Sequence, residues 1–372
     1  MKFKAKLSLT HTQLLYNLIN PLSKLQYQSS YSDEDTRGTI LYLDNDKLVL
    51  STRGSTEKND TEGIFCFAEL ITRDGIFNNH VIDSVEKDNA ILMEVCIIQF
   101  KTALKGVMET QKEASAAGSL GASHEVSIKL AKRNGGLPHL CFEVKDSNYV
   151  GNGANHHHRS ADGSGKDKSG IGVNYAVPVK MMRVDELQYH VPPRLGMPDL
   201  QLELPRDRPI RNVVERLRGI STQVYLEGCM SKGILTLRIN SDGASIRTSF
   251  NKLVPIHEDC KSTQQSQSQS QLSQQNLEVE GNGTSQAQSD SGQEYQAQAP
   301  VENEVERCTV KVDSRKLHTS LHWQQSLGMR DVSTAVLCLW ENEMLVLDVT
   351  LNPEIGRFMY YVPCQYMAVG EL

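Results

Sequence analysis

The sequence has little of what a membrane protein would need. Its longest notable apolar run, Ala335 to Trp340, is six residues long, whereas a helix that crosses a bilayer needs about 20 apolar residues. The opening stretch MKFKAKLSL also lacks the apolar core and cleavage site of a secretory signal. A chain of 372 residues can still bury a sizeable core. We therefore expect a soluble intracellular protein with no membrane partner.

The cysteines form no metal-binding or disulfide pattern. None belongs to a CxxC pair, and none stands at ligand spacing from a histidine. Most lie inside apolar stretches such as IFCFAEL, where a free thiol packs as a small hydrophobic group. The sequence therefore predicts neither a zinc site nor a disulfide framework for Cys66, Cys96, Cys141, Cys229, Cys260, Cys308, Cys338 and Cys364.

Catalytic motifs are missing as well. The chain has no GxSxG elbow, no HExxH helix and no recognisable pair of carboxylates. Gly165 and Lys166 could end a phosphate loop, but Asp167 follows them and no glycine lies five residues before Gly165. The histidines at 156–158 lie in a Gly/Asn-rich stretch without the preorganisation of a metal site. The sequence indicates no catalytic residue, no metal and no cofactor.

Two segments are too polar to enter a core. Residues 146–174 are rich in Gly, Ser, Asn and charge, and residues 258–305 form a Gln/Ser tract. We expect both to be disordered loops. The second either carries phosphorylation sites or partner contacts, or is simply a tolerated insertion.

The charge of the chain is unevenly distributed. The net charge is −6, but residues 258–305 alone carry eight acids and one lysine, so the remainder is about +1. Within that remainder, four helical segments total +8 and the other segments are acidic. Basic helix faces are often only a solvated surface. Four of them in an otherwise acidic chain favour phosphate binding, which needs repeated Lys and Arg rather than a particular motif.

Strands dominate the rest of the sequence. Seven short β-type runs extend from GTILYL to AVPVKMM, and seven more from QVYLEGC to RFMYYVP. Many alternate apolar with polar residues, as strands with one buried face do. Turn residues such as Asp44 to Asp46 separate them. The pattern predicts antiparallel sheets with few helices.

Four segments have the apolar spacing of amphipathic helices: Leu9 to Lys24, Gln99 to Lys112, Arg206 to Arg218, and Ser314 to Ser326. Each carries basic residues off its apolar stripe. In the third, Pro209 and Gly219 are start and stop signals, and we expect Arg208, Arg211 and Arg218 opposite the stripe. In the last, we expect Arg315, His318 and His322 to project together.

One pattern appears twice along the chain. Strand Met1 to Leu7 and strand Leu200 to Leu204 each lead into a basic helix, and strands, a second basic helix and more strands follow. Between the repeats, Arg183 to Pro198 has three prolines and no clean periodicity, so we expect an extended connector. The domains predicted are 1–182 and 199–372, with the connector at 183–198.

The residues resemble a known family. The start MKFKAKL, the run SIKLAKRNGGLPHLCFEV, the stretch NVVERLRGIS and the ending RFMYYVP are similar to the Hus-type subunit of the DNA-damage checkpoint sliding clamp. That clamp is the nine-one-one complex, a relative of proliferating cell nuclear antigen (PCNA). The resemblance covers nearly the whole chain outside the two polar insertions, although no single motif is diagnostic.

The resemblance implies an α+β fold of two similar PCNA-like domains, with antiparallel sheets outside and four basic helices inside a ring. Two Rad-type subunits would complete the ring, and a clamp loader ATPase would place it on double-stranded DNA without sequence specificity. Repair factors and the checkpoint kinase machinery would be further partners. The expected location is the nucleus, with a cytoplasmic pool.

Carried onto this sequence, the resemblance predicts DNA-binding residues on the inner helix faces. They are Lys24, Lys101, Lys105, Lys112, Arg208, Arg211, Arg216, Arg218, Arg315 and Lys316. The insertions at 146–174 and 258–305 are longer than the family pattern leads us to expect, and no peptide-pocket residue can be assigned at the connector.

Two other functions compete with a checkpoint clamp subunit. A PCNA-like homotrimeric replication clamp would share the fold and the inner charge but would assemble alone. A nucleic-acid-processing enzyme would need clustered Asp and Glu for metal ions.

Overall fold

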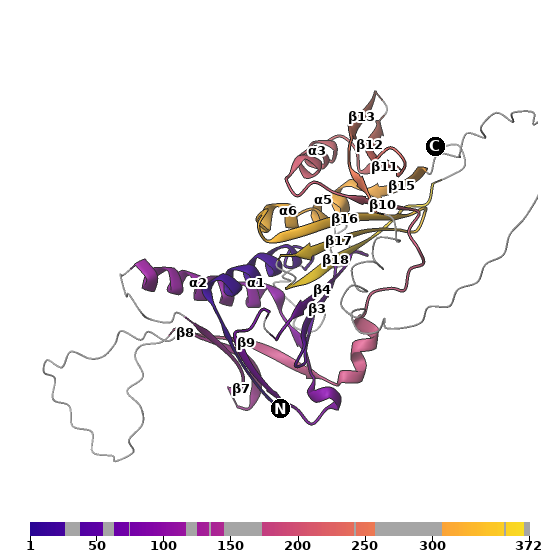
Figure 1. The fold of residues 1–372 in the computed structure, drawn as a ribbon. Helices are drawn as coiled ribbons and strands as arrows, with labels where there is room; N and C mark the ends of the chain where they lie inside the picture. Colours follow the sequence, from indigo (N-terminus) through magenta and orange to yellow (C-terminus); the bar gives the residue numbers. More distant parts are fainter. Residues whose placement is uncertain are drawn as a thin grey trace, which may run out of the picture.

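The structure is a computed structural model that describes residues 1–26, 38–54, 63–73, 75–116, 125–133, 135–144, 173–241, 243–256, 307–352 and 355–367. Within these ranges the chain forms two antiparallel sheets and five α-helices. The helices lie in one row along one side of the strands (Figure 1). None of the described helices is long and apolar enough to cross a membrane.

We call residues 1–182 the N-terminal half. Its elements are β1 (Lys2–Leu7), α1 (Leu9–Leu22), β2 (Thr39–Leu43), β3 (Lys47–Arg53), β4 (Phe65–Ile71), β5 (Asn79–Asp83), the 3₁₀-helix η1 (Lys87–Asn89), β6 (Ile91–Val95), α2 (Ile97–Ala116), β7 (Val126–Arg133), β8 (Leu137–Val144) and β9 (Val173–Met182).

We call residues 183–372 the C-terminal half. The 3₁₀-helix η2 (Val184–His190) opens it, and the following elements are β10 (Leu200–Glu203), α3 (Pro209–Leu217), β11 (Gln223–Cys229), β12 (Ile234–Ser241), β13 (Ala244–Phe250), β14 (Val254–Pro255), β15 (Arg307–Asp313), α5 (Ser314–Ser320), α6 (Trp323–Ser326), β16 (Val332–Trp340), β17 (Met344–Leu351) and β18 (Gly356–Pro363).

The two halves repeat the same strand pairing. β1 pairs with β5 and β7, and β10 pairs with β14 and β16. β2 pairs with β3 and β6, and β11 pairs with β12 and β15. β7, β8 and β9 form a meander, as do β16, β17 and β18. Equivalent elements of the halves can therefore be compared directly.

The halves differ in how their sheets close. In the N-terminal half β6 pairs with β9, which joins all nine strands into one sheet. In the C-terminal half β18 instead pairs with β4 of the N-terminal half. The result is a sheet of 14 strands through both halves, and a separate sheet of four strands in the order β13-β12-β11-β15.

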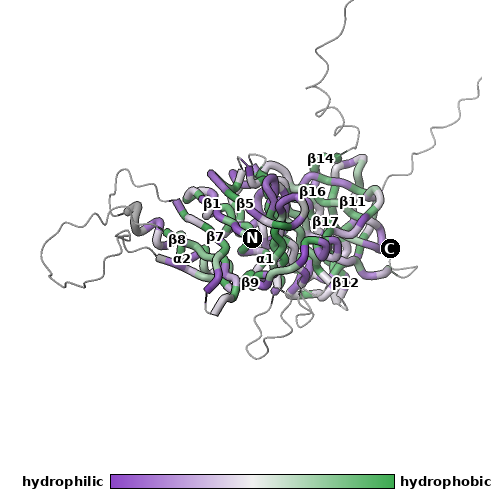
Figure 2. The backbone as a smooth tube through the Cα atoms, turned by 90° about the horizontal axis from the view of Figure 1, so that it is seen from below, coloured by the Kyte–Doolittle hydropathy of each residue, from purple (hydrophilic) through white to green (hydrophobic). Residues whose placement is uncertain are grey.

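The core follows from the alternation of the strands. In β1, Phe3, Ala5 and Leu7 are buried while Lys2 and Lys4 are exposed, because successive side chains of a strand point to opposite faces. Hydrophobic segments follow the strands of both halves in Figure 2. β2 is buried at every position, since a second apolar cluster covers its other face.

The connector differs from the extended segment that we expected. Its first part is the 3₁₀-helix η2, and the sequence prediction there was wrong. Val184, Leu187 and Leu195 pack on the second apolar cluster. Ser51 donates to the backbone oxygen of His190 at 2.8 Å. The connector is therefore held on the sheet by partly buried apolar side chains and by this hydrogen bond, which the sequence pattern did not reveal.

Other expectations need smaller corrections. The segment from Ser314 to Ser326 is not one helix, because α5 ends at Ser320 and α6 begins at Trp323. The short strands β5 and β14 had no counterpart in the sequence analysis. The expected loop at 146–174 overlaps β9 at Val173 and Asn174; the remainder of that loop and all of 258–305 lie outside the described residues.

Candidate nucleic-acid interface

Side-chain hydrogen bonds connect the helices of this row. Lys101 on α2 donates to Ser23 Oγ at the end of α1, at 3.2 Å. Asn20 on α1 donates to Ser326 Oγ on α6, at 2.9 Å. Arg208 donates from Nε to the backbone oxygen of Gln324, at 3.1 Å, which ties the start of α3 to α6. These three contacts, with the packing of α3 on α5, connect the N-terminal helices to the C-terminal ones.

Apolar stripes fix the orientation of the helices. On α2, Phe100, Leu104, Val107 and Met108 are all buried. On α1, Leu14, Leu15, Leu18, Ile19 and Leu22 are buried, and on α3, Ile210, Val214 and Leu217 are buried. Burying a Leu, Ile or Phe side chain stabilises a protein by about 1.5–3 kcal/mol, so these stripes determine which helix face turns outward.

Helix caps fix where the basic residues stand. Ser8 caps α1 by accepting from the backbone N–H of His11 at 3.1 Å. Asp313 caps α5 by accepting from the N–H groups of Arg315 and Lys316, at 2.8 and 3.2 Å. The Asp313 carboxylate also offsets the repulsion between these two cations and the positive end of the helix dipole.

Nine of the ten predicted DNA-binding side chains reach the surface. Lys24, Lys105, Lys112, Arg208, Arg216, Arg218 and Arg315 are exposed, and Lys101 and Lys316 are half-buried. Among the described residues, two of the ten predicted cations form ion pairs within α-helices: Lys105 lies 3.7 Å from Glu109, and Arg211 lies 3.9 Å from Glu215. The row of helices therefore keeps a net positive charge.

Arg211 does not lie on the exposed face that we expected. It is 8% exposed, and its Nε has no hydrogen-bond partner among the described residues. The physical reason is that α3 packs on α5 and Arg211 lies on the flank that faces this helix, where its charge acts on His318. The prediction that Arg211 opposes the stripe at the surface was wrong.

Electrostatic effects show how closely the lysines gather. Burial lowers the pKa of Lys101, and the charges of Lys24 and Lys105 lower it further. Lys24 follows α1, whereas the other two lysines belong to α2. Three cations from two helices thus share one part of the surface.

His322 marks where the charges of both halves meet. Burial lowers its pKa to about 4, and Lys24 and Arg211 act in the same direction. Lys24 belongs to the N-terminal half and Arg211 to the C-terminal half. Cations from both halves therefore lie close enough to act on the same imidazole.

His318 is also neutral, but it does not project as expected. It is 9% exposed, and burial, Arg218 and Arg211 lower its pKa. Arg218 lies 3.1 Å from Nδ1, and because a guanidinium only donates, Nδ1 must be the accepting nitrogen. His318 therefore positions Arg218 rather than facing solvent beside Arg315.

The sequence analysis missed the uncharged side chains of this surface. Asn20, Ser23 and Ser326 hold the helices together, but a search for charge passes over them. Their only signal is a polar residue at the end of an apolar helix. No group of three or more His, Cys, Asp or Glu suited to a metal ion occurs in the described part of the chain.

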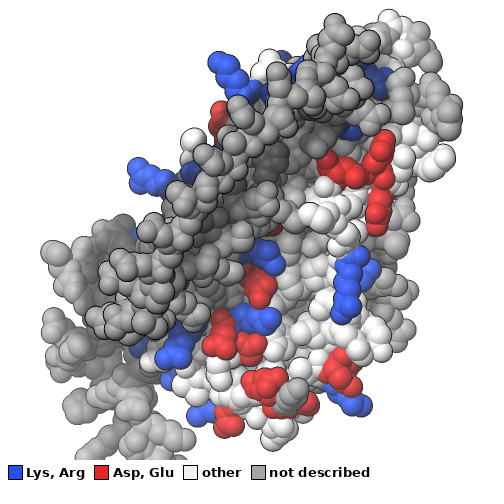
Figure 3. Space-filling view, turned by 45° about the vertical axis from the view of Figure 1, so that its right-hand side comes forward, with Lys and Arg blue, Asp and Glu red and all other residues white. Residues whose placement is uncertain are grey.

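The chemistry that this row offers is contact with phosphate. Lys and Arg bind phosphate oxygens, and such contacts carry no base sequence information. Figure 3 shows one face of the molecule, on which acidic and basic side chains are interspersed and neither sign predominates.

A duplicated antiparallel sheet behind one row of cationic helices defines an α+β clamp-type protein. The chain belongs to the Hus1-like protein family, whose model matches residues 1–365. This family comprises non-catalytic, PCNA-like subunits of the DNA-damage checkpoint clamp, which act in the nucleus together with other clamp subunits.

Proposed function

We propose that this chain is one subunit of a heterotrimeric ring that encircles double-stranded DNA and supports checkpoint signalling and DNA repair. Two Rad-type subunits complete the ring, and a clamp loader ATPase opens it. The chain contributes two clamp domains, 1–182 and 199–372, joined by residues 183–198. Repair factors and checkpoint kinases are recruited to the loaded ring, which performs no chemistry of its own.

The observation that supports this proposal is the row of helices that joins the two halves. Asn20 on α1 donates to Ser326 on α6, and exposed Lys and Arg residues lie on the helices of both halves. Lys24 and Arg211, one from each half, also lower the pKa of His322 at this contact. A surface of this kind matches the phosphates of a duplex that passes along both halves. Because the contacts are many, weak and independent of sequence, the ring can slide.

The ten predicted positions divide into two roles. Lys24, Lys101, Lys105, Lys112, Arg208, Arg216, Arg218, Arg315 and Lys316 contact phosphates. Arg211 acts from beneath the surface, where its charge adds to the potential.

Strand pairing suggests how the ring closes. β4 and β18 pair across the two halves, and their equivalents in the repeat are β13 and β9. No described strand pairs with the outer edge of β13, and residues 173–178 of β9 pair only with β8. We infer that these edges receive sister subunits, since an edge paired head to tail generates a ring.

Charge reversal tests the DNA-binding surface. Lys101, Lys105, Arg216 and Arg218 are changed to Glu in the assembled ring, and binding to duplex DNA is measured as a function of salt. We expect weaker binding and a slope of log K against log salt that is smaller by about 3–4, because each phosphate contact adds about 0.9. The matched control reverses the exposed Lys2, Lys4, Lys132 and Lys252 on strands and loops. An equal loss in both variants would contradict the assignment.

Native mass tests the assembly. Light scattering is measured for the chain alone and after mixing with each Rad-type subunit and with both. A heterotrimer of equal stoichiometry, formed only with both partners, is expected. A homotrimer of the chain alone would instead support a PCNA-like replication clamp, and a DNA-cleaving activity lost on mutating a single acid would support an enzyme.

A further inference from the structure

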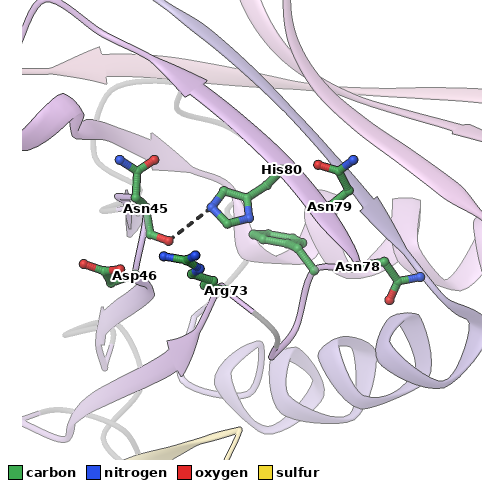
Figure 4. A pocket seen from close by; sticks show the side chains of 7 residues that line it. Asn45, Asp46, Arg73, Asn78, Asn79 and His80 are labelled. Atoms are coloured by element: carbon green, nitrogen blue, oxygen red, sulfur yellow. Dashed lines mark hydrogen bonds between the residues drawn. The ribbon is translucent and has the colours of Figure 1, made fainter.

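A pocket of about 380 Å³ opens at the end of β5, and none of the residues assigned to DNA lines it. The turn between β2 and β3 provides one wall through Asn45 and Asp46, and the segment after β4 provides Arg73 and Phe77 (Figure 4). Asn78, Asn79 and His80 complete the lining. Most of this lining is polar, and Phe77 is its apolar part.

Hydrogen bonds hold the walls of the pocket in place. Thr72 donates from Oγ1 to the backbone oxygen of Asn45 at 2.8 Å, and from its N–H to that of Asp46 at 2.9 Å. His80 Nε2 lies 3.1 Å from the same Asn45 oxygen (Figure 4). The pocket therefore exists before any ligand arrives, which lowers the entropy lost on binding.

The pocket is continuous with a strand edge. β5 is the last strand of the large sheet, and no described strand pairs with its outer side. Asn89 already donates to the backbone oxygen of Ile82 at 2.6 Å and so covers the far end of the strand. The stretch from Asn79 to Val81 remains, and it begins at the pocket wall. Val81 and Val85 nearby are 49% and 94% exposed.

The repeat shows that this edge is unusual. β14 is the equivalent edge strand in the other half, and it has two residues, one of which is Pro255. Proline removes a donor and is a common protection of sheet edges, as are short length and lysine. β5 has five residues and contains neither proline nor lysine.

We propose that the pocket and the edge of β5 together bind an extended peptide segment of a partner protein. Only an extended backbone matches the alternating N–H and C=O groups of a strand edge, and side chains placed in adjoining pockets give specificity. Arg73 would receive a carboxylate or carbonyl oxygen of the peptide, and Asp46 an N–H group. An apolar side chain would cover Val81. This site is independent of ring closure and of DNA.

The experiment uses the full chain and a random heptapeptide display library. The selected peptide is synthesised, and its Kd is measured for the wild type, Arg73→Ala, Val81→Lys and the control Val254→Lys, which changes the 56% exposed valine of β14. We expect about tenfold weaker binding for the first two variants, as loss of about 1.4 kcal/mol would give, and no change for the control. Equal thermal unfolding of all variants verifies their folding.

Methylation of the peptide backbone provides a second readout that does not depend on any variant. Amides of a paired strand point alternately toward and away from the edge, so N-methyl groups should weaken binding with a period of two residues. Failure to select any peptide, a flat methylation profile, or equal Kd values for all variants would overturn the proposal. So would a dimer of the chain that Val81→Lys abolishes, because the edge would then serve a second copy.

Discussion

The two halves build the same repeat with different helices. In the N-terminal half, α2 runs for 20 residues and lies against β8 and β9. Its C-terminal equivalent is broken into α5 and α6, of seven and four residues. The break lets α6 turn toward α1, where Ser326 meets Asn20. The shorter helices thus build the junction, while the long helix extends the basic surface.

The equivalent strands β4 and β13 also differ between the halves. β4 presents Phe65, Cys66, Phe67 and Ala68 to β18, all of them buried. β13, its equivalent, has the sequence ASIRTSF, and Arg247 in it is 62% exposed. Permanent interfaces are more apolar than transient ones. The apolar β4–β18 contact is of the permanent kind, and the more polar edge of β13 fits the proposed role of a contact that opens.

The largest expected effect comes from removing the core side chain of α6, the helix that contacts α1. Trp323 on α6 is 1% exposed, and its ring lies edge-on to Phe358 of β18, with the centroids 6.4 Å apart. Trp323→Ala should lower the free energy of unfolding by about 3–5 kcal/mol. Denaturant titration measures this change, and Gln325→Ala, an exposed neighbour, is the control. A loss below about 1 kcal/mol would show that Trp323 does not anchor α6 on the sheet.

A pH dependence of stability that arises from His322 should be next in size. His322 has a pKa lowered to about 4 when folded, compared with about 6.5 when unfolded. Its contribution to stability is therefore present above pH 6.5 and is lost as the pH falls toward 4. We expect His322→Gln to remove part of the acid-induced loss of unfolding free energy. The effect should be about 2 kcal/mol at most, because the imidazole of His322 is partly exposed. Denaturant unfolding at pH 7, 5.5 and 4.5 measures this change. The prediction is wrong if the free energy of unfolding falls equally with pH in the wild type and the variant.

Helix caps allow a matched comparison of the halves. Ser8→Ala removes the cap of α1, and Asp313→Ala removes that of α5. Each should cost about 1 kcal/mol, but the loss at Asp313 should be larger because this carboxylate also faces Arg315 and Lys316. Thermal unfolding distinguishes the two, and an equal shift would mean that the charge at the cap contributes nothing.

The smallest effect should come from single surface cations. Lys105→Gln and Arg216→Gln each remove one charge, from α2 and α3 respectively. In the assembled ring each should reduce the salt slope of DNA binding by about 1. A change in only one variant would show that the duplex follows only one half.

Much of this fold could be predicted from local patterns. All fourteen β-type runs are strands, because alternation and turn residues are properties of neighbouring positions. β5, with the sequence NHVID, was not predicted, because an edge strand pairs with one partner only and needs little apolar character. The β4–β18 pairing could not be predicted, because it joins strands almost 300 residues apart.

The candidate site was predicted unevenly for a similar reason. An amphipathic pattern shows which helix face packs on the sheet, and the exposure of Lys105 and Lys112 agreed with it. It does not show which helices pack on each other, so the burial of Arg211 and His318 was not anticipated. The break between Ser320 and Trp323 has no glycine or proline to mark it.

The contacts among Asn20, Ser326 and His322 have a consequence for how the molecule responds to its solution. Asn20 donates to Ser326 Oγ, and His322 lies 3.2 Å from the same oxygen. None of these groups carries a charge at neutral pH, although they lie in a cationic field. Concentrated salt screens ions but leaves neutral hydrogen bonds nearly unchanged. If this surface binds a polyanion as proposed, we expect concentrated salt to release the polyanion while the two halves keep their alignment.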